Sequence, residues 1–329
     1  MHHIPDIFND YAGFMKTRII LTAAELDIFT LLDERPLAAE DLARFLKADV
    51  HALMRILDCL VVFELLIKKN GRYGLTDQGA CFSSRHPESV LPLLLHMNSM
   101  WDNWTQLTET VRTGRNPNLK SVIAAQDKTV TSAFIGAMHV MGKSLSCEIA
   151  ASFDVSRFKR LLDIGGGAGT YTIAFLGKNP HMTAVLFDLP DVITLAVERL
   201  KRDGYLERVT LVAGNFYQDE LPAGCDLALL SAIIHQNSPQ ENFDLYKKIY
   251  RALEPDGVLL IRDHVMDESR TKPPAGALFA INMLVHTAGG DTYTFKEIKD
   301  ALEQAGFKKV QQLRSGERMD CLIEAQKPL

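Results

Sequence analysis

The spacing of apolar and polar residues changes near residue 157. Beyond that point, short apolar runs rich in β-branched residues alternate with amphipathic stretches of helical period. Alternating strands and helices predict an α/β fold on a mostly parallel sheet. We expect seven strands, the last two forming an antiparallel hairpin: one ending at Asp163, then Thr183–Phe187, Val209–Ala213, Asp226–Ala232, Val258–Asp263, Lys308–Leu313 and Met319–Ala325. Capping boxes at Ser238–Glu241 and Thr294–Glu297 predict helices that run through Leu253 and stop before Gly306.

Residues 1–150 carry mainly helical patterns with one small β element. Ile19–Leu32 is apolar and helix-forming, and residues 39–46 followed by His51–Leu66 predict a helix-turn-helix. Asn70-Gly71 is a strong hairpin turn, which completes a winged-helix pattern. A winged helix raises the possibility of DNA binding, but its second helix is apolar nearly all round and holds a single arginine, Arg55. We therefore expect that helix to be buried, most simply against a second subunit.

The strand that ends at Asp163 leads directly into a glycine-rich turn, residues 165–169. A dinucleotide-binding fingerprint expects a glycine where Thr170 stands, and the Gly-Lys-Ser/Thr of a P-loop is absent. The Asp163 carboxylate would repel a pyrophosphate and attract a cationic amino-acid group. The pattern therefore favours S-adenosylmethionine, which carries an ammonium and a sulfonium and no phosphate. The alternative is a tight strand-to-helix turn that binds nothing.

A second acid, Asp188, ends the next strand, about 20 residues beyond the glycines, where Rossmann-type units bind ribose. A carboxylate can accept hydrogen bonds from both vicinal hydroxyls of a ribose. Asp188 could instead cap a helix, since Asp188-Leu189-Pro190-Asp191 is also a good helix start. The two acids and the glycines have the spacing that a Rossmann-type unit requires, which favours ribose binding.

Composition narrows the class of protein. The 329 residues are enough for two domains, and 47% hydrophobic with 23% charged residues is typical of a soluble globular protein. A net charge of −5 gives no reason to expect nucleic acid or an anionic membrane as a partner. The cysteines are odd in number and scattered, without a C-x-x-C pair, and no residues have metal-ligand spacing. No leader pattern or long apolar run is evident. We expect a cytoplasmic protein that holds no metal.

Two residues form a candidate catalytic pair. His235 follows the fourth strand by three residues, and Asp263 ends the fifth. Ligands of open α/β sheets bind outside the carboxyl ends of the strands, so adjacent strands would bring these side chains together. A histidine can accept a proton from a hydroxyl while a carboxylate holds its tautomer. The alternative for His235 is a hydrogen-bonded loop residue, and His264 lies on the opposite side of its strand.

Together these residues resemble the family-2 small-molecule O-methyltransferases, a group that includes plant phenolic, hydroxyindole and bacterial antibiotic-tailoring enzymes. The motifs that carry the resemblance are Leu161–Gly169 and Phe187–Val192, and the resemblance covers essentially the whole chain. It implies a class I methyltransferase, Rossmann-like sheet and an essentially all-helical, winged-helix dimerisation domain at the N-terminus. The implied parts are that domain over 1–110, a helical connector lining the substrate pocket over 111–156, and an S-adenosylmethionine-binding domain over 157–329. A homodimer whose active site is closed partly by the partner subunit is also implied.

The resemblance assigns roles to individual residues. His235 matches the general base and Asp263 its supporting acid. The cofactor-contacting positions, which S-adenosylhomocysteine would also occupy as product, are Asp163, Gly165, Gly167, Gly169, Asp188, Leu189, Asn215, Phe216 and Ser231. The substrate-lining positions are Phe134, Met138, Met283 and Thr287. Phe134 and Met138 belong to a cluster of methionines and aromatics between residues 90 and 150 that would otherwise be ordinary core packing.

This chain departs from the family pattern after its histidine and at its second supporting carboxylate, and also where Asn215 replaces the usual Asp and Ser231 a cofactor-contacting lysine. The family follows its histidine with Asp-Trp, where this chain has Gln236-Asn237, and its second supporting carboxylate is replaced by Thr292, with Asp291 adjacent. We expect an S-adenosylmethionine-dependent methyltransferase that acts on a hydroxyl of a small aromatic or polycyclic acceptor. The alternatives are C- or N-methyl transfer by the same fold and a catalytically silent, cofactor-binding regulatory protein. Thr170 and Asp163 disfavour a nicotinamide oxidoreductase.

Overall fold

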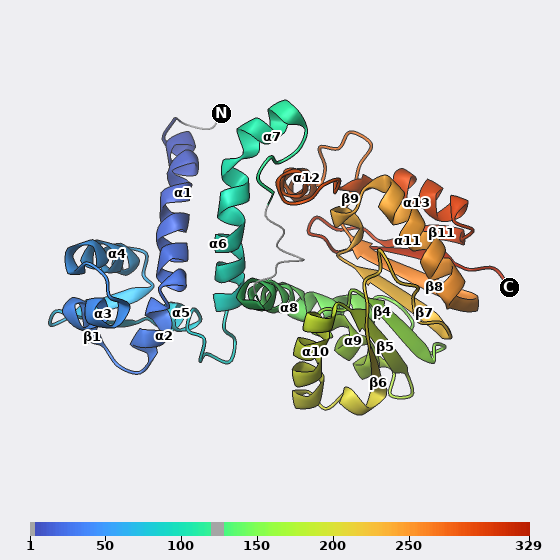
Figure 1. The fold of residues 1–329 in the computed structure, drawn as a ribbon, viewed down its shortest axis with the longest axis horizontal. Helices are drawn as coiled ribbons and strands as arrows, with labels where there is room; N and C mark the ends of the chain where they lie inside the picture. Colours follow the sequence, from blue (N-terminus) through green and yellow to red (C-terminus); the bar gives the residue numbers. More distant parts are fainter. Residues whose placement is uncertain (1–3, 120–127) are drawn as a thin grey trace. The chain divides into compact units, whose positions relative to one another are not determined.

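The computed structural model describes residues 4–119 and 128–329, and the chain forms two compact units, Met1–Trp101 and Asp102–Leu329 (Figure 1). We call these the N-terminal and C-terminal units and describe each by itself. Residues 120–127, which fall within the predicted connector, lie outside the described residues.

The N-terminal unit combines short helices with a small sheet. Its elements are α1 (Ile4–Glu25), α2 (Ile28–Asp33), β1 (Leu37–Ala38), α3 (Ala39–Leu46), α4 (Val50–Val62), β2 (Leu66–Lys69), β3 (Arg72–Leu75), α5 (Asp77–Ala80) and the first part of α6 (Leu91–Thr105). The predicted hairpin is present, because β2 and β3 pair antiparallel around Asn70-Gly71. β1 adds a third strand in the order β1-β3-β2, so this unit is not all-helical.

Two predicted helix boundaries in this unit were wrong. The segment predicted as one helix over Ile19–Leu32 is broken between α1 and α2, because Asp27 takes a left-handed backbone conformation with φ of 54°. The helix predicted to reach Leu66 ends at Val62, since Glu64 has φ of 60° and turns the chain into β2. Within α4, Leu53, Leu57 and Leu60 are buried in the core of the unit.

The C-terminal unit is built on a seven-stranded sheet in the order β11-β12-β8-β7-β4-β5-β6. Neighbouring strands from β8 to β6 run parallel, and β12 pairs antiparallel with both β8 and β11. All seven predicted strands are confirmed: β4 (Arg160–Ile164), β5 (Thr183–Asp188), β6 (Val209–Ala213), β7 (Cys225–Ser231), β8 (Leu253–Asp263), β11 (Lys308–Arg314) and β12 (Cys321–Gln326). Their ends shift by no more than two residues, except that β8 begins five residues before the predicted Val258, at Leu253, where the preceding helix was predicted to continue. A short parallel pair, β9 (Val265–Met266) and β10 (Tyr293–Thr294), was not predicted.

Helices cover both faces of this sheet (Figure 1). Alternate strand residues point to opposite faces. Leu162 of β4 packs in a core with α11 (Pro239–Ala252) and α13 (Phe295–Gln304), whereas Leu161 packs in a second core with α8 (Lys128–Ala151) and α9 (Thr170–Lys178). The remaining helices are α7 (Leu107–Thr113), α10 (Pro190–Arg202), α12 (Pro274–His286) and the short turns η1 (Leu206–Arg208) and η2 (Ile234–Gln236). Both predicted capping boxes are present, at the starts of α11 and α13.

Within the described part of the chain, no helix combines the length and apolar character needed to cross a membrane.

Candidate active site

The sheet brings the predicted site residues to one edge. β4, β5, β7 and β8 are neighbours that run parallel, so their carboxyl ends meet at the same edge. The chain moves outward from β4 to β5 in one direction and to β7 in the other, which creates a topological switch point. Ligands of open α/β sheets bind in the crevice at such a point.

The glycine turn between β4 and α9 depends on backbone conformations that other residues rarely adopt. Gly165, Gly167 and Gly169 have φ of 68°, 56° and 79°. A Cβ atom added to Gly165 would lie 2.6 Å from the Ile233 side chain, whereas one added to Gly167 would meet nothing within 4 Å. The turn is therefore packed against the protein at Gly165 and open at Gly167, which leaves room for a ligand against its backbone.

Asp163 lies buried beneath this turn, with 1% of its surface exposed. The Thr172 hydroxyl donates to Asp163 Oδ2 at 2.6 Å. Burial is the largest cause that raises the pKa of Asp163, to about 6, and the nearby charge of Asp188 also raises it. The site therefore holds a buried, poorly solvated carboxyl group, Asp163, next to a glycine turn that has almost no side chains. Thr172 is a partner that the sequence did not single out.

Asp188 holds the glycine turn as well as facing the edge of the sheet. Its Oδ2 accepts from the Gly167 amide at 2.8 Å, and its Oδ1 accepts from the Leu189 amide at 2.7 Å. Burial raises the pKa of Asp188, while these two amides lower it. Leu189 begins α10 as its N-cap residue and packs with Phe134 around Ala168 of the turn. Asp188 therefore does not cap α10, whose N-cap residue Leu189 has no side-chain cap bond, and its carboxylate has about four lone-pair sites, more than these two amides use.

The remaining predicted cofactor positions lie beside the same edge. Asn215 closes a turn after β6, with its Oδ1 accepting from the Tyr217 amide at 2.9 Å. The Phe216 ring lies 3.8 Å from where a Cβ on Gly165 would be. Ser231, at the end of β7, accepts from Arg262 Nε at 3.0 Å through its hydroxyl. Phe216 thus borders the glycine turn, and the Ser231 hydroxyl already accepts a hydrogen bond from the neighbouring strand.

These features fit S-adenosylmethionine. The open space at Gly167 and the two acids, Asp163 and Asp188, offer room and negative charge, which suit an amino-acid group and a ribose. Basic side chains that would hold a pyrophosphate are absent from the residues described at this turn.

His235 and Asp263 form the predicted pair. His235 lies in η2 just after β7, and Asp263 ends β8. The ring Nδ1 lies 2.9 Å from Asp263 Oδ1 and 3.0 Å from Oδ2, and both residues are buried. Burial alone would raise the pKa of Asp263, but the charge and hydrogen bond of His235 hold it below its usual range. With Nδ1–H donating to the carboxylate, Nε2 is the ring atom left to accept a proton.

Among the residues that the structure describes, Asp263 is the one carboxylate that hydrogen-bonds His235, and no second one takes the place of the family's second carboxylate. The Thr292 hydroxyl donates to the Gly276 carbonyl at 3.3 Å, away from the imidazole. The Asp291 carboxylate accepts from Arg270 at 3.3 Å and from the Thr292 amide at 2.7 Å. Asp291 instead supports the histidine through the backbone, because its amide donates to the His235 carbonyl at 2.9 Å.

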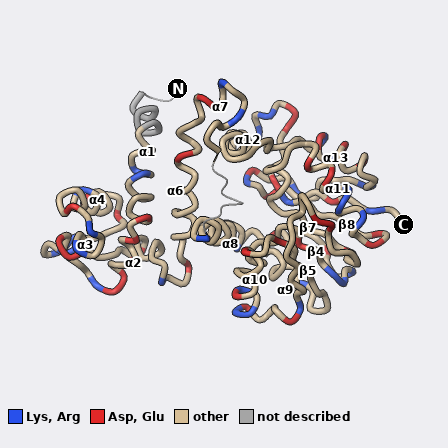
Figure 2. The backbone as a smooth tube through the Cα atoms, viewed as in Figure 1, with Lys and Arg blue, Asp and Glu red and all other residues tan. Residues whose placement is uncertain are grey.

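An uncharged helix covers the pair. α12 contains no Lys, Arg, Asp or Glu, as Figure 2 shows, and its Phe279 ring meets His235 edge to face with centroids 4.8 Å apart. The same ring lies 5.1 Å from His264, whose pKa burial lowers to about 4. An apolar helix has no pattern that distinguishes Phe279 from its neighbours, so the sequence did not identify it.

The four predicted substrate-lining residues divide between two helices. Phe134 and Met138 are on α8, Met283 is buried on α12, and Thr287 follows the end of α12. The Thr287 hydroxyl donates to the Met283 carbonyl at 2.8 Å, which ties these two positions together. Thr287 also borders a cavity of about 230 Å³ with Asp291 and Arg270. Met283 and Phe279 are both on α12, which places an apolar wall next to His235.

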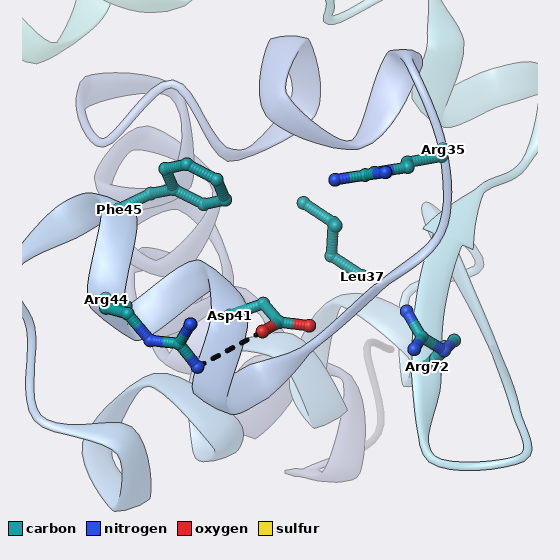
Figure 3. A pocket seen from close by; sticks show the side chains of 6 residues that line it. All are labelled: Arg35, Leu37, Asp41, Arg44, Phe45 and Arg72. Carbon is teal, nitrogen blue, oxygen red and sulfur yellow. Dashed lines mark hydrogen bonds and ion pairs between the residues drawn. The ribbon is translucent and has the colours of Figure 1, made fainter.

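A larger cavity, about 460 Å³, lies in the N-terminal unit and contains none of the predicted site residues. Figure 3 shows its lining of three arginines, an ion-paired aspartate and two apolar side chains: Arg35, Leu37, Asp41, Arg44, Phe45 and Arg72.

Similarity to known proteins agrees with this geometry. Residues 104–308 match the O-methyltransferase domain family, and residues 10–85 match the O-methyltransferase dimerisation domain. The chain is 29% identical to a 3-hydroxy-5-methyl-1-naphthoate 3-O-methyltransferase of Streptomyces sahachiroi, over 94% of this chain and 91% of that protein.

Two solved structures extend the similarity. Human N-acetylserotonin methyltransferase in complex with S-adenosylmethionine superposes with a TM-score of 0.83 at 25% identity, covering 100% of this chain and 99% of that one. The N,N-8-amino-8-demethyl-D-riboflavin dimethyltransferase of Streptomyces davawensis superposes with a TM-score of 0.81 at 27% identity, covering 99% and 100%. The chain therefore belongs to the O-methyltransferase family, as an S-adenosylmethionine-dependent O-methyltransferase with an N-terminal dimerisation domain.

Proposed function

We propose that this enzyme methylates a hydroxyl group on a small aromatic or polycyclic acceptor, with His235 as the general base. The observation that carries the proposal is the buried contact of His235 Nδ1 with Asp263, 2.9 Å long. A carboxylate in that position holds the ring in the tautomer whose Nε2 accepts a proton, and it stabilises the imidazolium that forms. The apolar wall of α12 suits an aromatic acceptor, and the S. sahachiroi and human relatives act on hydroxylated aromatic compounds.

Each part of the site has a distinct task in this proposal. S-adenosylmethionine, when bound, supplies an electrophilic methyl group on a positively charged sulfur. Asp163, the glycine turn and Asp188 hold the amino-acid and ribose ends, with Leu189, Asn215, Phe216 and Ser231 bordering the remainder. Phe134, Met138, Met283 and Thr287 orient the acceptor and exclude water from its hydroxyl. His235 removes the hydroxyl proton at Nε2, and alignment of the two substrates supplies much of the acceleration.

Steady-state assays of His235 variants test this assignment. We expect His235→Ala to lower kcat for N-acetylserotonin or 3-hydroxy-5-methyl-1-naphthoate by about 10²- to 10⁴-fold. The affinity for S-adenosylmethionine, measured by calorimetry, should stay unchanged, since this side chain makes no cofactor contact in the proposal. An unchanged kcat in His235→Ala would reject the base role. Gln240→Ala, an exposed change on α11, is the matched control.

A second candidate is N-methyl transfer by the same fold. The similarity to the riboflavin-amine dimethyltransferase, with a TM-score of 0.81, favours it. The departures at Gln236-Asn237 and Thr292 are also compatible with an acceptor that needs less help with deprotonation. Paired phenol and aniline acceptors of one ring system, assayed with methyl-labelled cofactor, separate the two functions.

We further propose that the enzyme is a cytoplasmic homodimer that pairs through its N-terminal region, predicted as residues 1–110. The match of residues 10–85 to the dimerisation domain supports the dimer, and the exposed apolar side chains Phe45 and Val62 offer surface for a partner. The free cysteines suit a reducing compartment.

The connector over 111–156 would line the acceptor pocket, and 157–329 would hold the cofactor. Sedimentation equilibrium tests the dimer, since a monomer at micromolar concentration would contradict it.

A further inference from the structure

The segment after His235 contains a buried polar residue where the family pattern has an aromatic one. Asn237 is completely buried, and each of its side-chain polar atoms has a partner. Its Oδ1 accepts from the Tyr217 hydroxyl at 2.5 Å, and its Nδ2 donates to Asn242 Oδ1 at 3.0 Å. The Tyr293 hydroxyl donates to the Asn237 carbonyl. Buried polar networks with every member satisfied are rigid, because losing one partner leaves an uncompensated group in a low dielectric.

The network continues to the histidine from both sides along the chain. Asn242 Nδ2 donates at 2.8 Å to the carbonyl of Ile234, the residue before His235. On the other side, the Asp291 amide donates to the His235 carbonyl at 2.9 Å. The backbone of η2 is therefore fixed immediately before, at and after the histidine. The contact with Asp263 sets the ring, and these bonds set the position from which the ring projects.

Tyr217 joins this network to Asn215 and Phe216, two of the predicted cofactor-contacting positions. Its amide donates to Asn215 Oδ1 at 2.9 Å, and its ring lies 4.5 Å from the Phe216 ring, centroid to centroid. Tyr217 as a whole is 47% exposed, but burial of its hydroxyl raises the pKa of that group to about 12, so that it stays protonated and acts as a donor. A continuous set of contacts thus runs from Asn215 and Phe216 through Tyr217 to Asn237.

We propose that the Tyr217–Asn237 hydrogen bond is a positioning device that holds His235 in register with Asp263 and ties the histidine segment to the cofactor segment. Neither residue contacts the reacting atoms, so both act through His235. The inference rests on the proposed base role of His235. It also explains how the histidine stays fixed in a chain that lacks the second family carboxylate. Buried hydrogen bonds from side-chain amides and hydroxyls to the backbone restrain the histidine instead.

The test compares Tyr217→Phe, which removes a single hydroxyl, with the surface control Gln240→Ala. Without any ligand, ¹⁵N NMR of the imidazole, assigned with His235→Ala, reports the tautomer. We expect one Nδ1–H tautomer in the wild type and in Gln240→Ala, and a mixture of both tautomers in Tyr217→Phe. For an acceptor that the wild type methylates, kcat should fall about 5-fold in Tyr217→Phe, as the loss of about 1 kcal/mol for one hydrogen bond predicts. KM for the acceptor should be unchanged, and the melting temperature should fall by no more than about 4 °C.

Two further results make the outcome decisive. Asn237→Ala should give a larger loss of kcat together with lower stability, and if it does not fold, Tyr217→Phe alone decides. The proposal is overturned if Tyr217→Phe keeps both the wild-type tautomer and the wild-type kcat. If no hydroxylated or amino aromatic acceptor is methylated by the wild type, the proposed function fails while the NMR comparison still judges the positioning role. If His235→Ala keeps full activity but Tyr217→Phe alters the tautomer, the base role fails and the structural link stands.

Discussion

Replacing Asp163 by asparagine should stabilise the cofactor-free protein at neutral pH. The carboxylate is 1% exposed, and burial raises its pKa from the usual 3.8 to about 6. The difference corresponds to about 3 kcal/mol of folding free energy, which the ionised side chain costs above pH 6. Asparagine keeps the size of the side chain and an oxygen that can accept from the Thr172 hydroxyl. The variant therefore removes the charge with little change in packing.

The pH dependence of this effect has a definite sign. A raised pKa means that the folded protein binds the proton more tightly than the unfolded chain does. Below about pH 4 the Asp163 carboxyl is protonated in both states of the wild type and costs the folded state nothing. As the pH rises from about 4 through 6, the folded wild type loses stability relative to the unfolded chain. The asparagine side chain of the variant does not titrate, so the stability difference between the two proteins should grow over that interval and stay constant above it.

Urea unfolding at a series of pH values between 4 and 8 measures this difference. The variant Asp191→Asn, at an exposed position in the first turn of α10, changes the net charge equally and should shift the unfolding free energy by less than about 0.5 kcal/mol. The affinity of Asp163→Asn for S-adenosylmethionine should fall, because the acid that attracts the ammonium group is lost. An Asp163→Asn protein that is less stable at pH 7, or a difference that does not vary with pH, would refute the reasoning.

Three further predictions concern the same edge of the sheet. Asp263→Asn should lower kcat by about 10²- to 10⁴-fold in steady-state assays, with cofactor affinity unchanged, because an amide cannot stabilise protonated His235; equal rates would contradict it. Gly165→Ala should lower the unfolding free energy in urea by about 1 to 3 kcal/mol, because the new Cβ would be strained by the left-handed backbone and would also lie 2.6 Å from a neighbouring side chain. Gly167→Ala should cost only the backbone strain, and its main effect should be weaker cofactor binding. Asp188→Ala should weaken S-adenosylmethionine binding at least about 10-fold by calorimetry, and intact affinity would exclude a ribose contact.

Much of the fold followed from local patterns. Strands such as Thr183–Asp188 are short, apolar and β-branched, and the capping boxes at Ser238 and Thr294 involve residues three apart, so each is determined by neighbours in the chain. The segments that sequence reasoning missed were short or strained. The helix breaks at Asp27 because this residue takes a left-handed backbone conformation, and no glycine marks the position in the sequence. The β9–β10 pair has only two residues per strand.

The candidate site divides in the same way. Glycine spacing, strand-end acids and a histidine after a strand are visible in the sequence, because the carboxyl ends of parallel strands share one edge. Which partner each group takes was decided only by the tertiary structure: the Thr172 hydroxyl on Asp163, Arg270 rather than His235 on Asp291, and the Phe279 ring on the imidazole. Those contacts join residues from separate elements, and burial and distance, which set their strength, exist only once the elements pack.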